Sequence, residues 1–214
     1  MTKYELGRIA AAELEKLYPD AACSLEYEGE PWKLLVMARL SAQCTDARVN
    51  VVSKELWKKY PTQKALASAD LCELEEIVRP CGLYKTKAKS ILETAKIIEN
   101  EYGGKIPQTM DELLMLPGIG RKIANLMLGD LFGQPNIVTD THCIRICGRL
   151  GFYPESEKSP AKIEKILAKF IEKPIQSDFC HRIVLFGRDI CTARSPKCED
   201  CPLKDVCKHI KCKK

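Results

Sequence analysis

A glycine-rich turn between two helical segments is the feature of this sequence that most constrains its fold. Residues 116–122 read Leu-Pro-Gly-Ile-Gly-Arg-Lys, and residues 110–116 before them have the composition of a short helix. Gly118 and Gly120 permit a positive φ and the close approach of another backbone, and Ile119 between them can point inward as an anchor. The segment therefore predicts a helix–hairpin–helix.

The start of the helix after this turn offers a docking point for a phosphate. Its unpaired amide N–H groups and the positive end of the helix dipole favour an anion. Lys122 stands in the first turn of that helix, where positive surroundings help an amine lose its proton and act as a nucleophile. We interpret the segment as a grip on a nucleic-acid backbone with a candidate catalyst beside it. The simpler interpretation of Lys122 as a solvated charge stays open on this segment alone.

A dinucleotide-binding loop is a poor alternative for the same glycines. In that motif the glycines follow a buried strand, and a ribose-binding acid comes about twenty residues later. Here a helical segment precedes the turn.

The apolar spacing is helical almost throughout the chain. Pro31 opens one helix, and Asp46 is expected to cap another that runs through Trp57. A helix over residues 85–102 ends at Gly103-Gly104, and strand-like alternation is nearly absent. We expect an all-α protein.

The Gly-Gln-Pro-Asn turn at residues 133–136 is the best candidate for a boundary between two helical subdomains. One subdomain, residues 24–134, is a helical bundle that bears the hairpin. Residues 1–23 and 135–214 form the other. Lys122 and Asp140 lie on opposite sides of the boundary, so both are expected beside a cleft between the subdomains.

Four cysteines near the C-terminus have the sharpest spacing in the chain. They follow the pattern Cys-x6-Cys-x2-Cys-x5-Cys within residues 191–207 and are Cys191, Cys198, Cys201 and Cys207. Their unequal gaps are unlike the paired Cys-x2-Cys knuckles of a structural zinc site and favour a 4Fe–4S cluster. Such a loop would present lysines to a phosphate backbone. Cys212 lies outside the pattern.

The other cysteines are dispersed among apolar neighbours. With no secretory signal in the sequence they are expected to be reduced thiols that act as small buried hydrophobes. They are Cys23, Cys44, Cys72, Cys81, Cys143, Cys147 and Cys180.

Charge and hydropathy narrow the class of protein further. The net charge is +5, and its excess falls in residues 135–214, with 16 Lys and Arg against 10 Asp and Glu. This excess suits a polyanion partner. No run of about eighteen apolar residues is present, and the N-terminal segment is an amphipathic helix. We expect a cytoplasmic monomer with no membrane association.

In combination, these features resemble an endonuclease III-type DNA glycosylase of the helix–hairpin–helix superfamily. The resemblance extends over essentially the whole chain. It rests on the hairpin, the cysteine loop and three further motifs, which are Leu-Ser-Ala-Gln-Cys-Thr-Asp at 40–46, Cys-Gly-Leu-Tyr at 81–84 with Lys87-Ala88, and Asp-Thr-His at 140–142.

The resemblance implies removal of oxidised pyrimidines from duplex DNA, followed by cleavage at the abasic site. Lys122 would be the nucleophile at C1′, and Asp140 would either stabilise positive charge on the sugar or help deprotonate the amine. A lysine at this position favours a bifunctional enzyme over a monofunctional adenine or mismatch glycosylase. Residues expected to contact DNA are Gln43, Leu83, Leu116, Gly118, Gly120 and Arg121.

Within the DNA-contacting set, Gln43 would fill the space of the flipped nucleotide and Leu83 would wedge the opposite strand. Cys44 departs from the family pattern, in which alanine is common after the glutamine. Two other classes remain as alternatives: a non-catalytic helix–hairpin–helix module with a structural metal, and an iron–sulfur electron-transfer protein. Both leave the pairing of Lys122 with Asp140 unexplained.

Overall fold

The computed structural model describes residues 1–211, and the all-α prediction is confirmed because no strand occurs among them. The α-helices are α1 Lys3–Leu17, α2 Pro31–Leu40, α3 Asp46–Lys59, α4 Gln63–Ala67, α5 Leu71–Val78, α6 Tyr84–Glu101, α7 Met110–Met115, α8 Arg121–Phe132, α9 Thr141–Leu150, α10 Pro160–Phe170, α11 Gln176–Asp189 and α12 Lys208–Lys211. Two 3-10 turns are η1, Arg79–Cys81, and η2, Lys173–Ile175. Cys212 lies outside the described residues.

The chain forms two compact units. The hairpin unit is Cys23–Phe132, and the terminal unit combines Met1–Ala22 with the residues from Gly133 onward. Each unit has its own apolar core.

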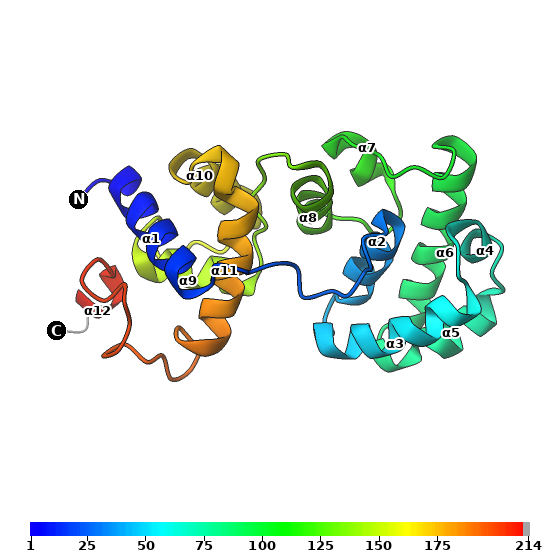
Figure 1. Ribbon diagram of the computed structural model, residues 1–214, viewed down its shortest axis with the longest axis horizontal. Coiled ribbons are helices and arrows are strands. Elements are labelled where there is room, and N and C mark those ends of the chain that lie inside the picture. The colour runs from blue at the N-terminus through cyan, green and yellow to red at the C-terminus, as the bar shows by residue number, and fades with distance from the viewer. Residues whose placement is uncertain (212–214) are drawn as a thin grey trace. The chain divides into compact units, whose positions relative to one another are not determined.

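In the hairpin unit, α6 is the central element. It packs against α2, α4 and α5, and α8 packs against α2 and α7 (Figure 1). Leu34, Met37 and Leu40 of α2 are buried in this core with Ile91 and Ile98 of α6. The hairpin between α7 and α8 therefore rests on a helical base.

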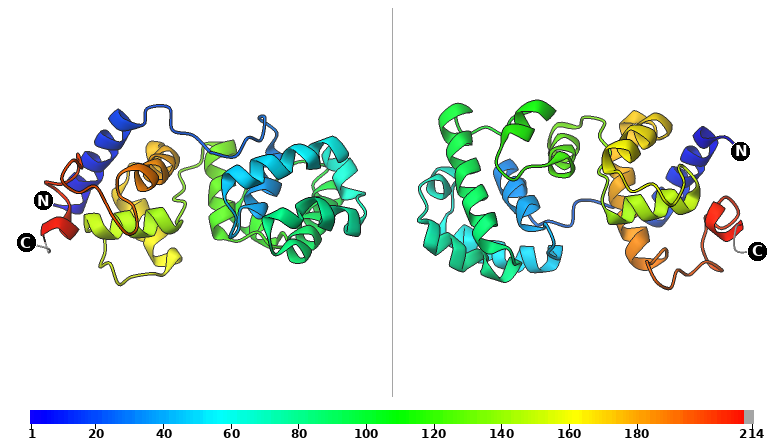
Figure 2. Two further views of the ribbon diagram at one scale, coloured as in Figure 1. Left: turned by 90° about the horizontal axis from the view of Figure 1, so that it is seen from below. Right: turned by 180° about the vertical axis from the view of Figure 1, so that it is seen from behind.

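The terminal unit brings segments from both ends of the chain together. The N-terminal helix α1 packs against α10 and α11, and α9 packs against α11 and α12 (Figures 1 and 2). Leu14 of α1 shares the core with Phe179 and Ile183 of α11. The cysteine loop contributes Cys201 and Cys207 to the same core.

Helix starts differ from expectation at one point. Asp46 was expected to cap α3, but Thr45 does so, since its Oγ1 accepts a hydrogen bond from the Arg48 amide at 3.4 Å. Asp46 is the first residue of α3, where the positive end of the helix dipole stabilises a carboxylate.

The short helix α4 lacks a strong periodic pattern and was not expected. Cys72 was expected to be buried but is exposed. Within the described chain, no helix is both long and apolar enough to cross a membrane.

Candidate nucleic-acid interface and metal centre

The turn between α7 and α8 follows from its Pro-Gly dipeptide. The Ile119 amide donates a hydrogen bond to the Leu116 carbonyl at 3.1 Å, and Gly118 has a φ of 76°. Pro at the second position and a positive φ at the third are the features of a type II turn. The expectation for Gly118 is confirmed. Gly120 is not among the residues with a positive φ, so Gly118 alone of the two uses that freedom.

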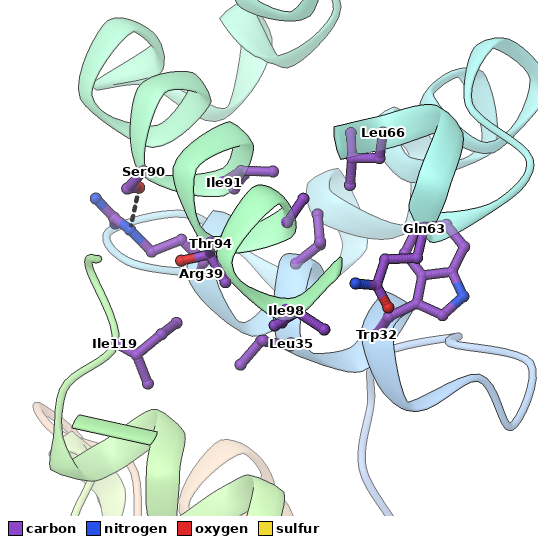
Figure 3. Close-up of a pocket in the computed structure, with 12 residues that line it drawn as sticks. Trp32, Leu35, Arg39, Gln63, Leu66, Ser90, Ile91, Thr94, Ile98 and Ile119 are labelled. Carbon is purple, nitrogen blue, oxygen red and sulfur yellow. Dashed lines mark hydrogen bonds between the residues drawn. The ribbon is translucent and has the colours of Figure 1, made fainter. Parts of the chain in front are cut away.

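The two glycines also differ in their surroundings. A Cβ on Gly118 would lie 2.4 Å from Nε of Arg39 and 3.0 Å from Oγ of Ser90. Arg39 Nε donates a hydrogen bond to Ser90 Oγ at 2.9 Å, which holds the guanidinium there (Figure 3). A Cβ on Gly120 would meet no heavy atom within 4 Å. Gly118 is therefore required by packing, and Gly120 leaves open space at the turn.

Two contacts attach the turn to α6. Ile119 is buried, as expected for an anchor, and it lines a small pocket with Thr94 and Ile98 of α6 (Figure 3). Thr94 Oγ1 donates a hydrogen bond to the Pro117 carbonyl at 3.1 Å. The turn is therefore held from both its apolar and its polar side.

The residues that follow the turn are solvent-facing. Arg121 and Lys122 are the first two residues of α8, and both are exposed. The side chain of Leu116 is buried in the core, so its part in the interface is limited to its backbone. The hairpin therefore presents backbone and two cationic side chains to solvent.

Asp140 is the N-cap of α9 in the terminal unit. Its Oδ1 accepts a hydrogen bond from the Cys143 amide at 2.7 Å. A bond of this kind is the usual N-cap interaction of an aspartate side chain. The side chain is partly exposed, so the carboxylate is fixed and still reachable.

Gln43 and Leu83 share a backbone conformation that side chains rarely adopt. Their φ angles are 55° and 48°, and Glu28 is the other described non-glycine residue with a positive φ. Gln43 is exposed, and Leu83 is 59% exposed although it is a large apolar residue. Such strain persists only where the surrounding structure enforces it, and it concentrates at functional sites.

Sequence reasoning missed a polar stripe on α6 that supports these segments. Lys87, Ser90 and Thr94 are buried, and their i, i+3, i+7 spacing places them on one helix face. The sequence signal for this stripe is the presence of polar residues at helix positions whose spacing is typical of a buried, apolar face. Burial lowers the pKa of Lys87.

The four cysteines of the C-terminal loop line one pocket. The loop folds in tight turns, in which the Cys201 amide donates to the Cys198 carbonyl and the Cys207 amide to the Lys204 carbonyl. All four thiols are free of disulfides. No group of three or more His, Cys, Asp or Glu side chains in residues 1–211 has the geometry of a site for a single metal ion. The four cysteines therefore converge on one pocket.

Two arginines of α9 hold the start of this loop. Arg145 donates hydrogen bonds to the carbonyls of Cys191 and Gly187 at 2.9 and 3.1 Å. Arg149 donates to Sγ of Cys191 at 3.3 Å and to the Thr192 carbonyl at 2.8 Å. The positive charge beside Sγ suits a thiolate ligand.

The pocket lined by the four cysteines also contains a buried histidine nitrogen that has no hydrogen-bond partner. Nε2 of His209 is buried and has no hydrogen-bond partner, while Nδ1 lies 2.8 Å from Glu155 Oε1. Burial raises the pKa of the Cys201 and Cys207 thiols. Four convergent sulfurs, a cation and an orphan nitrogen fit an iron–sulfur cluster, whose binding displaces the thiol protons.

A helix–hairpin–helix on a helical bundle, with a cysteine loop for an iron–sulfur cluster, defines a class of DNA repair protein. Residues 36–173 match the family model described as HhH-GPD superfamily base excision DNA repair protein. Residues 191–207 match the iron–sulfur binding domain of endonuclease III.

Curated relatives agree with both matches. Endonuclease III of Synechocystis sp. is 44% identical over 91% of this chain and 88% of its own length. Endonuclease III of Bacillus subtilis is 42% identical over 90% of this chain and 87% of its own length. The chain belongs to the endonuclease III family, whose members are base-excision DNA glycosylases with abasic-site lyase activity.

Solved structures give the same result. A trapped endonuclease III–DNA covalent intermediate aligns with a TM-score of 0.92 and 42% identity, over 100% of this chain and 99% of that one. A thermostable thymine-DNA glycosylase has a TM-score of 0.88 at 19% identity and so shares the fold. The protein binds a 4Fe–4S cluster, and Cys191, Cys198, Cys201 and Cys207 are the residues that fit it.

Proposed function

We propose that Lys122 is the nucleophile of this glycosylase and that its substrates are oxidised pyrimidines in duplex DNA. The observation that carries the proposal is the position of Lys122, exposed in the first turn of α8 directly after the hairpin. A phosphate bound at the hairpin amides would bring the neighbouring sugar toward this amine.

The reaction needs one amine and one carboxylate. Neutral Nζ of Lys122 attacks C1′ of the flipped nucleotide, and the N-glycosidic bond breaks so that the base leaves with a proton. The sugar ring opens at the C1′–O4′ bond, and a Schiff base forms between C1′ and Nζ. Loss of a C2′ proton then expels the 3′ phosphate, and water releases the sugar from the lysine.

Asp140 supplies the carboxylate. The cap bond to the Cys143 amide engages Oδ1 and fixes the side chain. We assign Oδ2 to the substrate side, where a negative charge stabilises a sugar that becomes positive as the base leaves.

The remaining residues would bind and open the duplex. Gln43 fills the gap left by the flipped nucleotide, and Leu83 wedges the other strand, which compensates for lost stacking. Gly118, Gly120 and Arg121 hold the phosphate backbone, and the exposed Lys197, Lys204 and Lys208 add a basic surface. The bound cluster organises that loop. The protein would act as a monomer on DNA in the cytoplasm, at the nucleoid in a prokaryote.

Borohydride trapping tests the assignment of the nucleophile. Reduction converts the Schiff base into a stable protein–DNA adduct, so wild-type protein should be trapped on DNA that contains thymine glycol or an abasic site. Lys122→Ala should form no adduct and should still bind the DNA. The matched control, Lys96→Ala, removes another exposed lysine of the hairpin unit and should keep trapping. Undiminished trapping by Lys122→Ala would refute the proposal.

A further inference from the structure

Lys87 is a buried lysine that the reaction above does not use. Its side chain is fully buried, and Nζ donates hydrogen bonds to the Leu40 carbonyl at 2.8 Å and to the Cys81 carbonyl at 2.7 Å. Leu40 is the last residue of α2, and Cys81 is the last residue of η1. One ammonium group therefore connects the ends of two elements that are 41 residues apart in the sequence.

Each of these ends leads directly into a strained, exposed residue. Gln43 follows Leu40 in a turn that the Cys44 amide closes on the Ser41 carbonyl at 3.1 Å. Leu83 follows Cys81 by two residues, and its own carbonyl accepts a hydrogen bond from the Lys87 amide at 3.0 Å. Because both turns are short, the positions of the two carbonyls determine where Gln43 and Leu83 project.

A further contact joins the same two turns. The thiols of Cys44 and Cys81 interact directly, and burial, with that neighbouring thiol, raises the pKa of Cys81 to about 11. The titratable groups that act on Lys87 are these two thiols and Arg39, and no carboxylate is among them. The cation is thus held by carbonyls alone.

A buried cation without an acidic partner is costly, and an apolar residue at this core position would be the simpler solution for stability. A cation is useful where two carbonyls must be held at a set separation, since an ammonium has three donors and strong, short bonds.

We propose that Lys87 is a positioning residue, which fixes the spacing of Gln43 and Leu83 so that both enter the duplex at one lesion. The inference rests on the proposed roles of these two residues. Functional side chains must be held to within about 0.5 Å by the groups behind them. Two turns supported by one ammonium satisfy that demand without contact between Lys87 and the DNA.

The proposal predicts a dependence on substrate that a purely structural role does not. Gln43 and Leu83 matter most when a stacked base must be extruded, and least for a preformed abasic site, which has no base to unstack. Lys87→Met keeps the length and apolar stem of the side chain and removes the donors. It should slow single-turnover excision of thymine glycol about tenfold or more, and cleavage of a preformed abasic site about threefold or less.

Two controls separate position from stability. Lys96→Met removes an exposed lysine from the same helix and should leave both rates unchanged. Lys87→Met introduced into a Gln43→Ala, Leu83→Ala background should have no further effect on excision, because the residues that it positions are already absent. Thermal unfolding shows whether each variant is folded. If Lys87→Met does not fold, Lys87→Gln, which keeps an amide donor, serves in the same assays.

The outcomes distinguish this inference from the proposed function. A selective loss of excision that disappears in the double-alanine background supports it. An equal loss on both substrates, or no loss on either, overturns it while wild-type excision still supports the function. Wild-type protein that fails to excise thymine glycol refutes the proposed function itself.

Discussion

Gly118 occupies a position where a side chain meets two obstacles. Its φ of 76° strains any L residue, and a Cβ would lie 2.4 Å from Arg39 Nε. Gly118→Ala should therefore lower the free energy of unfolding by about 2–4 kcal/mol, measured by urea denaturation.

Gly120→Ala is the matched control for stability. Its site has open space and no positive φ, so its free energy of unfolding should change by less than about 1 kcal/mol. If Gly118→Ala lost no more stability than Gly120→Ala, neither the positive φ nor the contact with Arg39 would constrain this position.

The conformation of a residue could be predicted where its immediate sequence neighbours determine it. A Pro-Gly pair enforces a turn, so the hairpin and the inward direction of Ile119 followed from the sequence. The left-handed conformations of Gln43 and Leu83 did not, because neither residue favours a positive φ and the surrounding fold imposes it. The burial of Lys87 was not predicted either, since a lysine in a helix is ordinarily solvated.

At the scale of one element, Asp140 combines two roles that substitution can separate. Asparagine is as good an N-cap as aspartate, whereas alanine cannot accept the bond from the Cys143 amide. Asp140→Asn should keep the free energy of unfolding within about 0.3 kcal/mol of wild type, and Asp140→Ala should lower it by about 1 kcal/mol.

Both variants should lose most excision activity, because neither retains the charge. Paired unfolding and single-turnover measurements check this expectation. If Asp140→Asn kept wild-type excision, the carboxylate would have no electrostatic role, and Asp140 would be a helix cap alone.

Helices with strong apolar periodicity and clear end signals were predictable as elements. The helix expected over residues 85–102 is α6, Tyr84–Glu101, and it ends at the expected glycines. The short helices α4 and α12 were not predicted, because they have too few residues for a period to appear. The cap of α3 was assigned to Asp46 and not to Thr45 because both residue types cap helices well and they are adjacent in the sequence.

At the scale of the whole molecule, the cluster should stabilise one unit and not the other. Cys201 and Cys207 belong to the core of the terminal unit, together with Leu203 and residues of α9 and α11. Removal of the iron with a reductant and a chelator leaves these thiols without ligand bonds. Hydrogen exchange measured by mass spectrometry should then speed up in α9 and α11.

The hairpin unit provides the internal control for that experiment. Exchange in α2 and α6 should remain unchanged, because their core is separate. Uniformly faster exchange in both units, or no change in either, would contradict the view that the cluster supports the terminal unit alone. The sequence predicts the cluster's ligands from their spacing, but which core they join depends on contacts between distant segments.

The terminal unit is built from two separate segments of the chain, and this affects the order in which the protein folds during synthesis. Its first helix, α1, belongs to a core completed by residues from Gly133 onward. During synthesis α1 emerges before the hairpin unit, whereas the helices that pack against it, α10 and α11, emerge only after the whole hairpin unit. The hairpin unit can therefore fold on the ribosome before the partners of α1 have been made, and the terminal unit is completed only after the later helices and the cysteine loop have emerged.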